Sequence, residues 1–275
     1  MTDIPSVTLA NGVAMPALGL GTSPMGDRKA EEIVAAGLRD GYRLVDTAEN
    51  YRNEGGVGRG IRASGVDRNE VFVTTKFNKI WHGEEAVHEA FSNSTERLGL
   101  DQIDLLLIHW PNPQQDRYVD AWRGMIQLLD AGKVRAIGVS NFKPAHLDRL
   151  RDETGVLPHV NQIELDPRHS RADERAVHTE LGIVTESWSP IGAGNDLLAE
   201  PTIVEIAGRR SKTPAQIVLR WHVQVGLIPI PKTSTPSRMT ENLDVFDFAL
   251  ADEDMRDLAQ LDGRDEVTDS DRFGH

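Results

Sequence analysis

The sequence predicts an α/β protein folded as a (β/α)8 TIM barrel with an N-terminal β-hairpin, and three observations support this fold. Short β-branched or apolar runs alternate with longer amphipathic runs. The short runs number eight in a chain of 275 residues, which is close to the usual size of such a barrel. Several short runs are apolar at consecutive positions, as is typical of parallel strands that are buried on both faces.

The first element expected is the hairpin, because residues 7–15 alternate in polarity around Asn11-Gly12. The runs between the predicted strands have the spacing of amphipathic helices, with Val87, Phe91 and Leu98 on one stripe of one of them. The eight predicted strands are residues 17–21, 43–47, 71–76, 103–109, 134–140, 159–165, 183–188 and 227–232.

Two helix starts can be placed closely. Thr213 is followed by Pro214 and, three positions on, by Gln216, which is the pattern of a capping box with proline in the first turn. Thr235-Pro236 opens a second helix in the same way. These two starts place helices on both sides of the last predicted strand.

An open, doubly wound sheet is the alternative fold. That fold usually carries a G-x-G-x-x-G turn directly after its first strand. The first predicted strand here ends in Gly19-Leu20-Gly21-Thr22, which lacks the turn. The glycine-rich run at residues 55–60 has a different spacing and does not directly follow a strand. We interpret it as close helix packing near the barrel wall, not as a phosphate-binding loop.

Composition limits the classes of partner. The net charge of −13 repels nucleic acid and anionic lipid, so we expect neither as a partner. The absence of cysteine excludes disulfides and thiolate chemistry. No apolar run approaches membrane-spanning length, and residues 1–10 lack the layout of a signal peptide. We therefore expect a cytoplasmic protein, a single domain over residues 1–275 and, since no outer helix shows a hydrophobic excess, a monomer.

Polar side chains close several adjacent strands. In a TIM barrel the C-terminal ends of the strands form the active-site face, so these side chains should converge there. Each has a structural interpretation when taken alone: an ion pair that plugs the barrel, a hydrogen-bonded core histidine, or surface packing. Their coincidence on one rim favours a site. The residues that mark it are Asp46, with Tyr51 just beyond, Lys76, His109, Ser140, Gln162, Trp188 and Lys232.

The motifs around these residues resemble those of the aldo-keto reductases. The matching segments are residues 46–54, Thr75-Lys76, 107–111, 138–142 and 230–232, with Arg238, Glu241 and Asn242 following. Glu186-Ser187-Trp188 is similar to the bacterial branch that includes diketogluconate reductases. The resemblance covers nearly the whole chain. It implies a (β/α)8 barrel that reduces aldehydes or ketones to alcohols with NADPH, on carbonyls of small-dicarbonyl or keto-sugar type.

The resemblance also implies the catalytic roles. Hydride comes from NADPH and the proton from Tyr51. Lys76 would lower the pKa of Tyr51 from its ordinary value of about 10. Asp46 would pair with Lys76 and keep it charged. His109 would hydrogen-bond the substrate oxygen, so that Tyr51 and His109 stabilise the charge that develops there.

The NADPH site follows from the same motifs. Ser140, Asn141 and Gln162 match residues that bind the nicotinamide amide, and Trp188 matches the aromatic residue that stacks on its ring. Lys232, Thr233 and Arg238 match the site of the 2′-phosphate, at the start of the helix that begins with Thr235-Pro236. Glu241 and Asn242 match the adenine end. Gly21, Thr22, Ser189 and Ser234 complete the expected cofactor contacts.

Substrate contacts are expected from Ser23, Trp81 and Trp110. Ser23 stands where many family members carry an aromatic residue, and residues 77–82 depart from the commoner sequence, so substrate identity stays open. The glycine-containing segment 191–195 matches a flap over the cofactor. The C-terminal tail, residues 268–275, either closes one side of the pocket, as in the family, or is disordered.

Two other functions are compatible with a barrel. A metal-dependent hydrolase would need several His or carboxylate ligands on the rim, and only His109 ends a strand. A catalytically silent, cofactor-binding barrel would not need Tyr51, Lys76 and His109 together. Turnover of a carbonyl substrate would separate it from an enzyme, and we expect no metal.

Overall fold

The computed structural model describes residues 4–263 and 267–274. Eight parallel strands form one sheet in sequence order, from β3 to β10, and a separate antiparallel hairpin precedes them. The hairpin strands are β1 (Ser6–Thr8) and β2 (Ala14–Pro16). The sheet strands are β3 (Leu20–Gly21), β4 (Leu44–Asp46), β5 (Phe72–Phe77), β6 (Ile103–Ile108), β7 (Val134–Ser140), β8 (Val160–Glu164), β9 (Val184–Trp188) and β10 (Ile228–Pro229). The predicted fold class is confirmed.

The sheet curls until its first and last strands meet. The amide of Gly19 donates to the carbonyl of Pro229 (3.0 Å), and that of Gly21 donates to the carbonyl of Pro231 (3.1 Å). Both prolines lack an N–H and cannot donate in return. At this seam, the junction of β3 and β10, the hydrogen bonds run only from the amides of the β3 side to the carbonyls of the β10 side. Strands β3 and β10 are each two residues long, whereas the sequence predicted strands of five and six residues.

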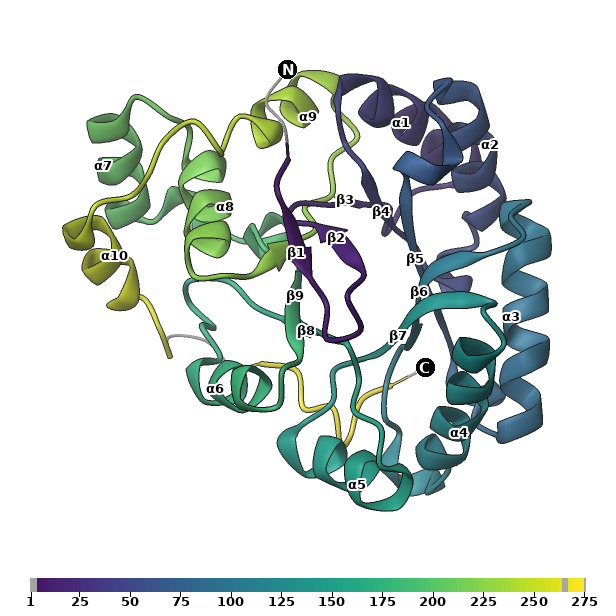
Figure 1. Ribbon diagram of the computed structural model, residues 1–275. Coiled ribbons are helices and arrows are strands. Elements are labelled where there is room, and N and C mark those ends of the chain that lie inside the picture. The colour runs from purple at the N-terminus through teal and green to yellow at the C-terminus, as the bar shows by residue number, and fades with distance from the viewer. Residues whose placement is uncertain (1–3, 264–266, 275) are drawn as a thin grey trace.

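Helices surround the strands as an outer ring (Figure 1). Two of them, α7 and α8, lie between β9 and β10, and two more follow β10. None of the helices within the described ranges is long and apolar enough to span a bilayer. The helices are α1 (Asp27–Asp40), α2 (Glu54–Ser64), α3 (Glu84–Leu98), α4 (Tyr118–Asp130), α5 (Pro144–Thr154), α6 (Ala172–Glu180), α7 (Pro201–Arg210), α8 (Pro214–Gln224), α9 (Pro236–Leu243) and α10 (Asp252–Ala259).

The two helix starts placed from sequence are confirmed. The Thr213 hydroxyl accepts a hydrogen bond from the amide of Gln216, and the Gln216 side chain accepts one from the amide of Thr213, which is the reciprocal pattern of a capping box. Helix α9 begins at Pro236 without a side-chain cap. In its first turn Pro236 has no N–H to satisfy, and the amides of Arg238 and Met239 donate to the carbonyl of Thr235.

The barrel interior is apolar at one end and polar at the other. Alternation along β4 turns both Leu44 and Asp46 inward, so that Leu44 lies one layer below the carboxylate. The lower layer is closed by Leu9 and Met15 from the hairpin, which pack with Leu44, Phe72 and Ile228. Figure 1 shows the hairpin across this end of the barrel. The opposite end, where the strands finish, is left open.

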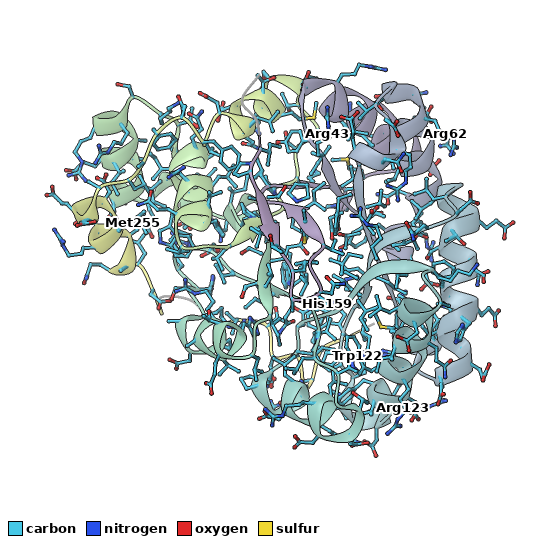
Figure 2. All side chains as sticks on the ribbon, in the orientation of Figure 1. Arg43, Arg62, Trp122, Arg123, His159 and Met255 are labelled. Carbon is cyan, nitrogen blue, oxygen red and sulfur yellow. The ribbon has the colours of Figure 1, made fainter. Side chains whose placement is uncertain are left out.

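The space between helices and strands is filled by buried side chains (Figure 2). On α4, Trp122 is fully buried and its indole N–H donates to the carbonyl of Val156 (3.0 Å). The next residue, Arg123, lies on the outside and pairs with Asp120 and Glu153. This inward–outward division is what the amphipathic runs in the sequence predicted.

The glycine-rich run at residues 55–60 lies in α2, where it permits close helix packing, as predicted. A Cβ atom on Gly58 would lie 1.8 Å from the carbonyl oxygen of Leu98, at the end of α3. A Cβ atom on Gly56 would lie 1.9 Å from the carbonyl oxygen of Asp27, at the start of α1. Three helices can thus meet at contact distances that no larger residue allows.

We expect Gly58→Ala to lower the free energy of unfolding by about 1–3 kcal/mol or more, because the new methyl group collides with backbone that cannot move without shifting a helix. Urea unfolding followed by circular dichroism measures the change. Gly208→Ala is the matched control: apart from its chain neighbours and the backbone of its own helix α7, a methyl group there would meet no described atom within 4 Å, so alanine should stabilise by about 0.5–1 kcal/mol. Equal effects of both substitutions would contradict the packing argument.

Candidate active site

A cavity of about 630 Å³ lies at the end of the barrel where the strands finish. Residues at the C-terminal ends of seven of the strands, or just beyond them, contribute to its wall, as do the segment after β9 and one aromatic residue of the tail. The residues expected from sequence that line it are Gly21, Ser23, Asp46, Tyr51, His109, Trp110, Ser140, Asn141, Gln162, Trp188, Ser189, Lys232 and Arg238. The structure therefore brings most of the expected site together in one place.

A buried ion pair lies beneath the cavity. The Lys76 ammonium is 2.6 and 2.8 Å from the two carboxylate oxygens of Asp46, and it donates a third hydrogen bond to the carbonyl of Thr47 (3.0 Å). Both side chains are almost completely inaccessible to solvent. Burial is the largest single effect and lowers the pKa of Lys76, but the charges of Asp46 and Tyr51 and the hydrogen bonds to Asp46 together outweigh it, so the pKa lies above its usual value. Lys76 is therefore a permanent cation.

Tyr51 lies above this ion pair. It belongs to a short 3-10 turn, Glu49–Tyr51, which directly follows β4 and so places the ring over the end of the strand. The Lys76 ammonium is 5.2 Å from the centroid of the Tyr51 ring. The His109 ring meets the Tyr51 ring edge-on, with centroids 5.9 Å apart. A phenol, an imidazole and an ammonium thus lie together at the floor of the cavity.

The pKa of Tyr51 differs from the sequence expectation. Burial raises the pKa of Tyr51, and Lys76 offsets this only in part, so the net shift is upward. Lys76 does lower the pKa of Tyr51, as expected, but burial of the phenol raises it by more, and the charge of Asp46 adds to the increase. Tyr51 consequently holds its proton at neutral pH, as a proton donor must.

Gln162 connects the ion pair to a second carboxyl group. Its side-chain amide donates one hydrogen bond to Asp46 (2.9 Å) and one to Glu186 (2.6 Å). Gln162 and Glu186 are both buried and lie opposite each other on β8 and β9. Burial, followed by the charge of Asp46, raises the pKa of Glu186 to about 8. Since the amide nitrogen faces both carboxyls, the amide oxygen of Gln162 stays available for another partner.

Asn141 and Trp188 form the next part of the wall. The Trp188 indole N–H donates to the Asn141 side-chain oxygen (2.9 Å), and the Asn141 amide donates to the carbonyl of His109 (3.1 Å). Asn141 adopts a left-handed conformation with φ of 65°, which turns its side chain into the cavity at the end of β7. Ser140 beside it donates to the carbonyl of Gln162 (2.8 Å). Trp188 thus presents a fixed aromatic face.

Lys232 and Arg238 lie at the other end of the cavity. Both side chains are exposed, and neither forms an ion pair with any residue in the ranges 4–263 and 267–274. Thr233 is buried and its hydroxyl accepts from the amide of Thr235 (3.1 Å), which shapes the turn into α9. Among the described residues, these two cations have no acidic partner, and they lie beside a helix start on a protein whose net charge is −13, so the local potential favours an anion.

Several expected cofactor contacts lie away from the cavity. Thr22 is buried and donates to the carbonyl of Asp46 (2.9 Å), so it supports the end of β4. Ser234 is exposed on the turn before α9. Glu241 accepts a hydrogen bond from Thr213 (2.7 Å), and Asn242 is buried against Tyr42. These four expected contacts do not line the cavity, and neither does Thr233.

Aromatic residues line another part of the cavity wall. The Trp110 ring stacks with that of His109 and meets the Phe273 ring edge-on, with the latter centroids 4.9 Å apart. Ser23 lies at the cavity wall next to Tyr51. Trp81 does not line the cavity; its indole N–H donates to Glu49 at 2.8 Å. Trp81 therefore packs behind the turn that carries Tyr51.

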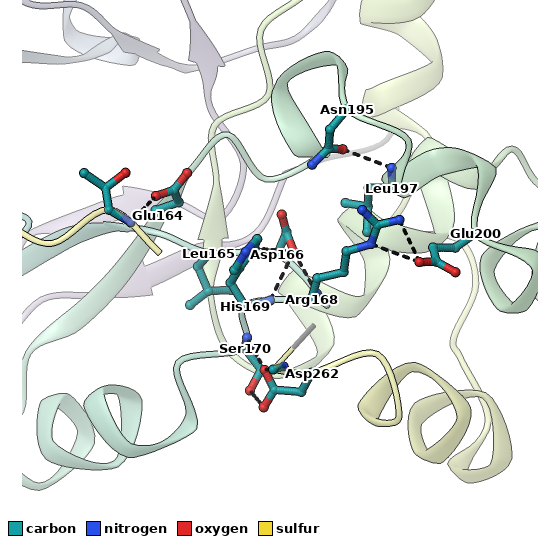
Figure 3. Close-up of polar contacts among 12 residues, drawn as sticks. Glu164, Leu165, Asp166, Arg168, His169, Ser170, Asn195, Leu197, Glu200 and Asp262 are labelled. Atoms are coloured by element: carbon teal, nitrogen blue, oxygen red, sulfur yellow. Dashed lines mark hydrogen bonds and ion pairs between the residues drawn. The ribbon is translucent and has the colours of Figure 1, made fainter. Parts of the chain in front are cut away.

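The segment 191–195 covers part of the cavity. Gly192, Ala193 and Gly194 all have positive φ, so this short loop turns back over the opening. Its far end is fixed by Arg168, which binds Asp196 at 2.6 Å and Glu200 at 2.6 Å. Figure 3 shows Arg168 reaching Glu200 and Asn195 accepting from the amide of Leu197. The loop has one anchored end and one glycine-containing end.

The described part of the C-terminal tail, residues 267–274, crosses the outer edge of the cavity. Lys143 binds both Asp269 and Asp271 at 2.6 Å, and His146 lies 3.1 Å from Asp271. These contacts hold Phe273 at the cavity wall. The sequence left open whether the tail closes one side of the pocket or is disordered, and the described part of the tail closes it. His275 lies outside the described residues.

The histidines of the described chain are spread over several elements. Among the described residues, no group of three or more His, Asp or Glu side chains is arranged to hold a metal ion. His109 is at the end of β6, whereas His88, His146, His178 and His222 lie in helices. The arrangement at the rim is one of proton donors and a cation, which suits proton transfer to an oxygen.

Comparison with known proteins identifies the family. The model of the aldo/keto reductase family matches residues 14–263. The chain belongs to the aldo/keto reductase family. As a member of this family, it is an NADP-dependent oxidoreductase.

Individual relatives extend this result. The 2,5-diketo-D-gluconic acid reductase B of Corynebacterium sp. is 49% identical over 276 residues and covers 100% of this chain and 99% of its own. An aldo-keto reductase of Mycolicibacterium smegmatis is 48% identical and covers 94% of each chain. A point mutant of Gox0644 in complex with NADPH has a TM-score of 0.94 at 42% identity, covering 98% of both chains. The Bombyx mori aldo-keto reductase with NADP has a TM-score of 0.90 at 34% identity, covering 98% of this chain and 96% of its own.

Some residues of the site were not singled out as functional from sequence. Glu186 was noted only for its resemblance to a bacterial branch, and Phe273 and Glu49 were not considered. Glu186 could have been found, because it lies two positions before Trp188 on the same strand and so faces the same interior. Phe273 could not, because its position depends on how the tail crosses the barrel.

We expect Lys76→Met to lower the free energy of unfolding by about 3–5 kcal/mol at pH 7, because it leaves the Asp46 carboxylate buried without its counter-ion. The deficit relative to the parent should shrink toward pH 5, where the isolated carboxyl can take up a proton more cheaply. Urea unfolding at both pH values measures it. The double variant Asp46→Asn/Lys76→Met should recover most of the loss. A deficit below about 1 kcal/mol in the single variant at pH 7 would show that the pair does not behave as a buried ion pair.

Proposed function

We propose that this chain reduces an aldehyde or ketone to an alcohol with NADPH, with Tyr51 as the proton donor. The observation that carries the proposal is the arrangement of three groups at the cavity floor: a buried Asp46–Lys76 pair, a protonated Tyr51 above it, and His109 beside Tyr51. Membership of the aldo/keto reductase family supports the same chemistry. Residues 1–275 are proposed to form a single domain; a monomeric state and a cytoplasmic location stay predictions.

The cavity fits NADPH at both ends. At one end the Gln162 amide oxygen and the Asn141 amide can meet a carboxamide, and Trp188 offers a flat aromatic face to a ring. At the other end Lys232 and Arg238, which lack acidic partners among the described residues, suit a phosphate. The relatives of known structure that support this assignment were solved with NADPH and with NADP.

When bound, NADPH supplies the hydride. The chain supplies the proton and the electrostatic environment. Tyr51 donates its proton to the substrate oxygen, and Lys76 lowers the cost of the tyrosinate left behind. His109 stabilises the same oxygen from the other side. Asp46 keeps Lys76 charged and fixed throughout. The flap at residues 191–195 and the tail exclude water from the cavity.

The substrate class is proposed to be a small dicarbonyl or a keto sugar. The wall around Trp110 and Phe273 is aromatic, whereas Ser23 gives a polar contact beside Tyr51. The 49% identical relative is a diketogluconic acid reductase, which supports a keto-sugar substrate. NADPH consumption, followed by its near-ultraviolet absorbance, with phenylglyoxal and with 2,5-diketo-D-gluconate tests both classes. Tight NADPH binding without turnover on either would favour a catalytically silent barrel.

We expect Tyr51→Phe to lower kcat by about 100-fold or more, since the proton donor is lost. The Kd for NADPH, measured by fluorescence titration, should change by less than about two-fold, because the phenol hydroxyl is not among the proposed cofactor contacts. Tyr118→Phe, on the helix α4, is the matched control and should retain parental kinetics. Parental rates in the Tyr51 variant would refute its role.

We expect the parent to bind NADPH more tightly than NADH. The variant Arg238→Ala should bind NADPH about 10–100-fold more weakly and NADH about equally well, because only NADPH carries the 2′-phosphate. Fluorescence titration with both cofactors measures this. Arg28→Ala, which removes an exposed arginine of α1, is the control and should keep the preference. Equal affinity of the parent for the two cofactors would contradict the assignment of this end of the cavity.

A further inference from the structure

Glu186 is a buried carboxyl group that the proposed mechanism does not use. It lies in the middle of β9, is fully inaccessible, and points into the barrel beneath the cavity. Its neighbours in register are Gln162 on β8 and Ile228 on β10. Gln162 gives it one hydrogen bond of 2.6 Å through Oε2, while Oε1 has no hydrogen-bond partner among the described residues.

The surroundings of Glu186 disfavour a negative charge. The charged groups whose fields reach it are Asp46 on β4 and Lys76 on β5, and the attraction of Lys76 is shared with Asp46, which it contacts directly. An ionised carboxylate with one oxygen lacking any donor is costly to bury, whereas a carboxylic acid is much less so. Burial and Asp46 together raise the pKa of Glu186 to about 8.

Glu186 also constrains the orientation of Gln162. The amide group of Gln162 directs both of its N–H bonds to carboxyl oxygens, one on Asp46 and one on Glu186. A rotation that exchanged the amide oxygen and nitrogen would place the oxygen against Asp46, which repels it. Loss of the Glu186 acceptor would leave one N–H without a partner in a buried position. The two acceptors together therefore fix the direction of the amide oxygen.

We propose that Glu186 is a positioning residue for the reductase site: in its protonated form it holds the Gln162 amide for the cofactor and leaves Asp46–Lys76 as the only charged pair beneath Tyr51 in the described chain. Ionisation of Glu186 at alkaline pH adds a second negative charge beside Asp46. That charge makes a tyrosinate at Tyr51 less favourable, and the transfer of the Tyr51 proton to a substrate becomes slower. The kinetic part of this inference rests on the carbonyl reduction proposed above; the stability part does not.

The pH dependence of thermal unfolding tests the protonation state without substrate or cofactor. The folded-state pKa of Glu186 lies above its unfolded value, so its contribution to stability is present at low pH and is lost as the pH rises toward 8. Glu186→Gln cannot ionise. We expect the Tm of this variant to match the parent near pH 5 and to exceed it by at least about 3 °C at about pH 8.5. Glu164→Gln, on the neighbouring strand and partly exposed, should show a constant offset from the parent.

Cofactor binding tests the positioning role. Glu186→Leu keeps a similar volume but removes the acceptor for Gln162. We expect it to raise the Kd for NADPH, measured by fluorescence titration at about pH 6.5, by about 5–20-fold. Glu186→Gln restores an acceptor and should bring the Kd back to within about two-fold of the parent. An unchanged Kd in the leucine variant would overturn the positioning role.

The pH profile of kcat completes the test. For carbonyl reduction, kcat of the parent should decline above about pH 8, whereas Glu186→Gln should keep its rate to higher pH and match the parent at about pH 6.5. Superimposable Tm and kcat profiles of parent and Glu186→Gln between about pH 5 and pH 9.5 would overturn the inference. So would a loss of more than about ten-fold in kcat at the lower pH, since it would mean that Glu186 acts as an anion. If no carbonyl is reduced at all, the Tm comparison still decides the protonation state.

Discussion

The Asp46–Lys76 ion pair can be buried beneath the cavity only because every hydrogen of the ammonium has an acceptor. Asp46 supplies two acceptors and the carbonyl of Thr47 supplies the third. That arrangement requires β4 and β5 to stay in register, with Val45 opposite Val73 and Asp46 opposite Thr74, so that Lys76 can bend back to the carboxylate. Tyr51 follows directly from the end of β4, and Gln162 binds the same carboxylate from β8. The geometry of the whole floor therefore depends on one charge-neutral pair.

The electrostatics of the cavity divide it into two parts. At the end that holds the ion pair, burial raises the pKa of Tyr51 by more than Lys76 lowers it, so that the tyrosine keeps its proton. At the opposite end Lys232 and Arg238 have no acidic partner in the described chain, although acidic residues outnumber basic ones by 43 to 30. A polyanionic cofactor would thus be attracted to one end only. Cofactor attraction is thus assigned to the end whose cations are unpaired among the described residues, and proton transfer to the end where the lysine and the carboxylate are paired.

The sequence predicted the fold and the composition of the cavity floor because both depend on strand periodicity. Alternation along a strand and the convergence of strand ends place Asp46, Lys76 and His109 on one rim whatever the loops do. Periodicity could not predict the direction in which the pKa of Tyr51 shifts, which depends first on how completely the phenol is buried. It also could not predict the position of Phe273, which is set by contacts of the tail with Lys143, far earlier in the chain. The shortness of β3 and β10 was readable in principle from Pro229 and Pro231.

The seam between β3 and β10 has a consequence for biosynthesis. Residues of the proton-transfer end are translated early, up to His109, whereas Lys232 and Arg238 are translated late. Until β10 has left the ribosome, β3 and β9 remain open edges of an unclosed sheet, with unpaired backbone groups that can recruit other strands. The backbone amides of Gly19 and Gly21 donate to the carbonyls of Pro229 and Pro231, which are translated about 210 residues later. A nascent chain of this protein is therefore most exposed to misassembly just before its last strand arrives.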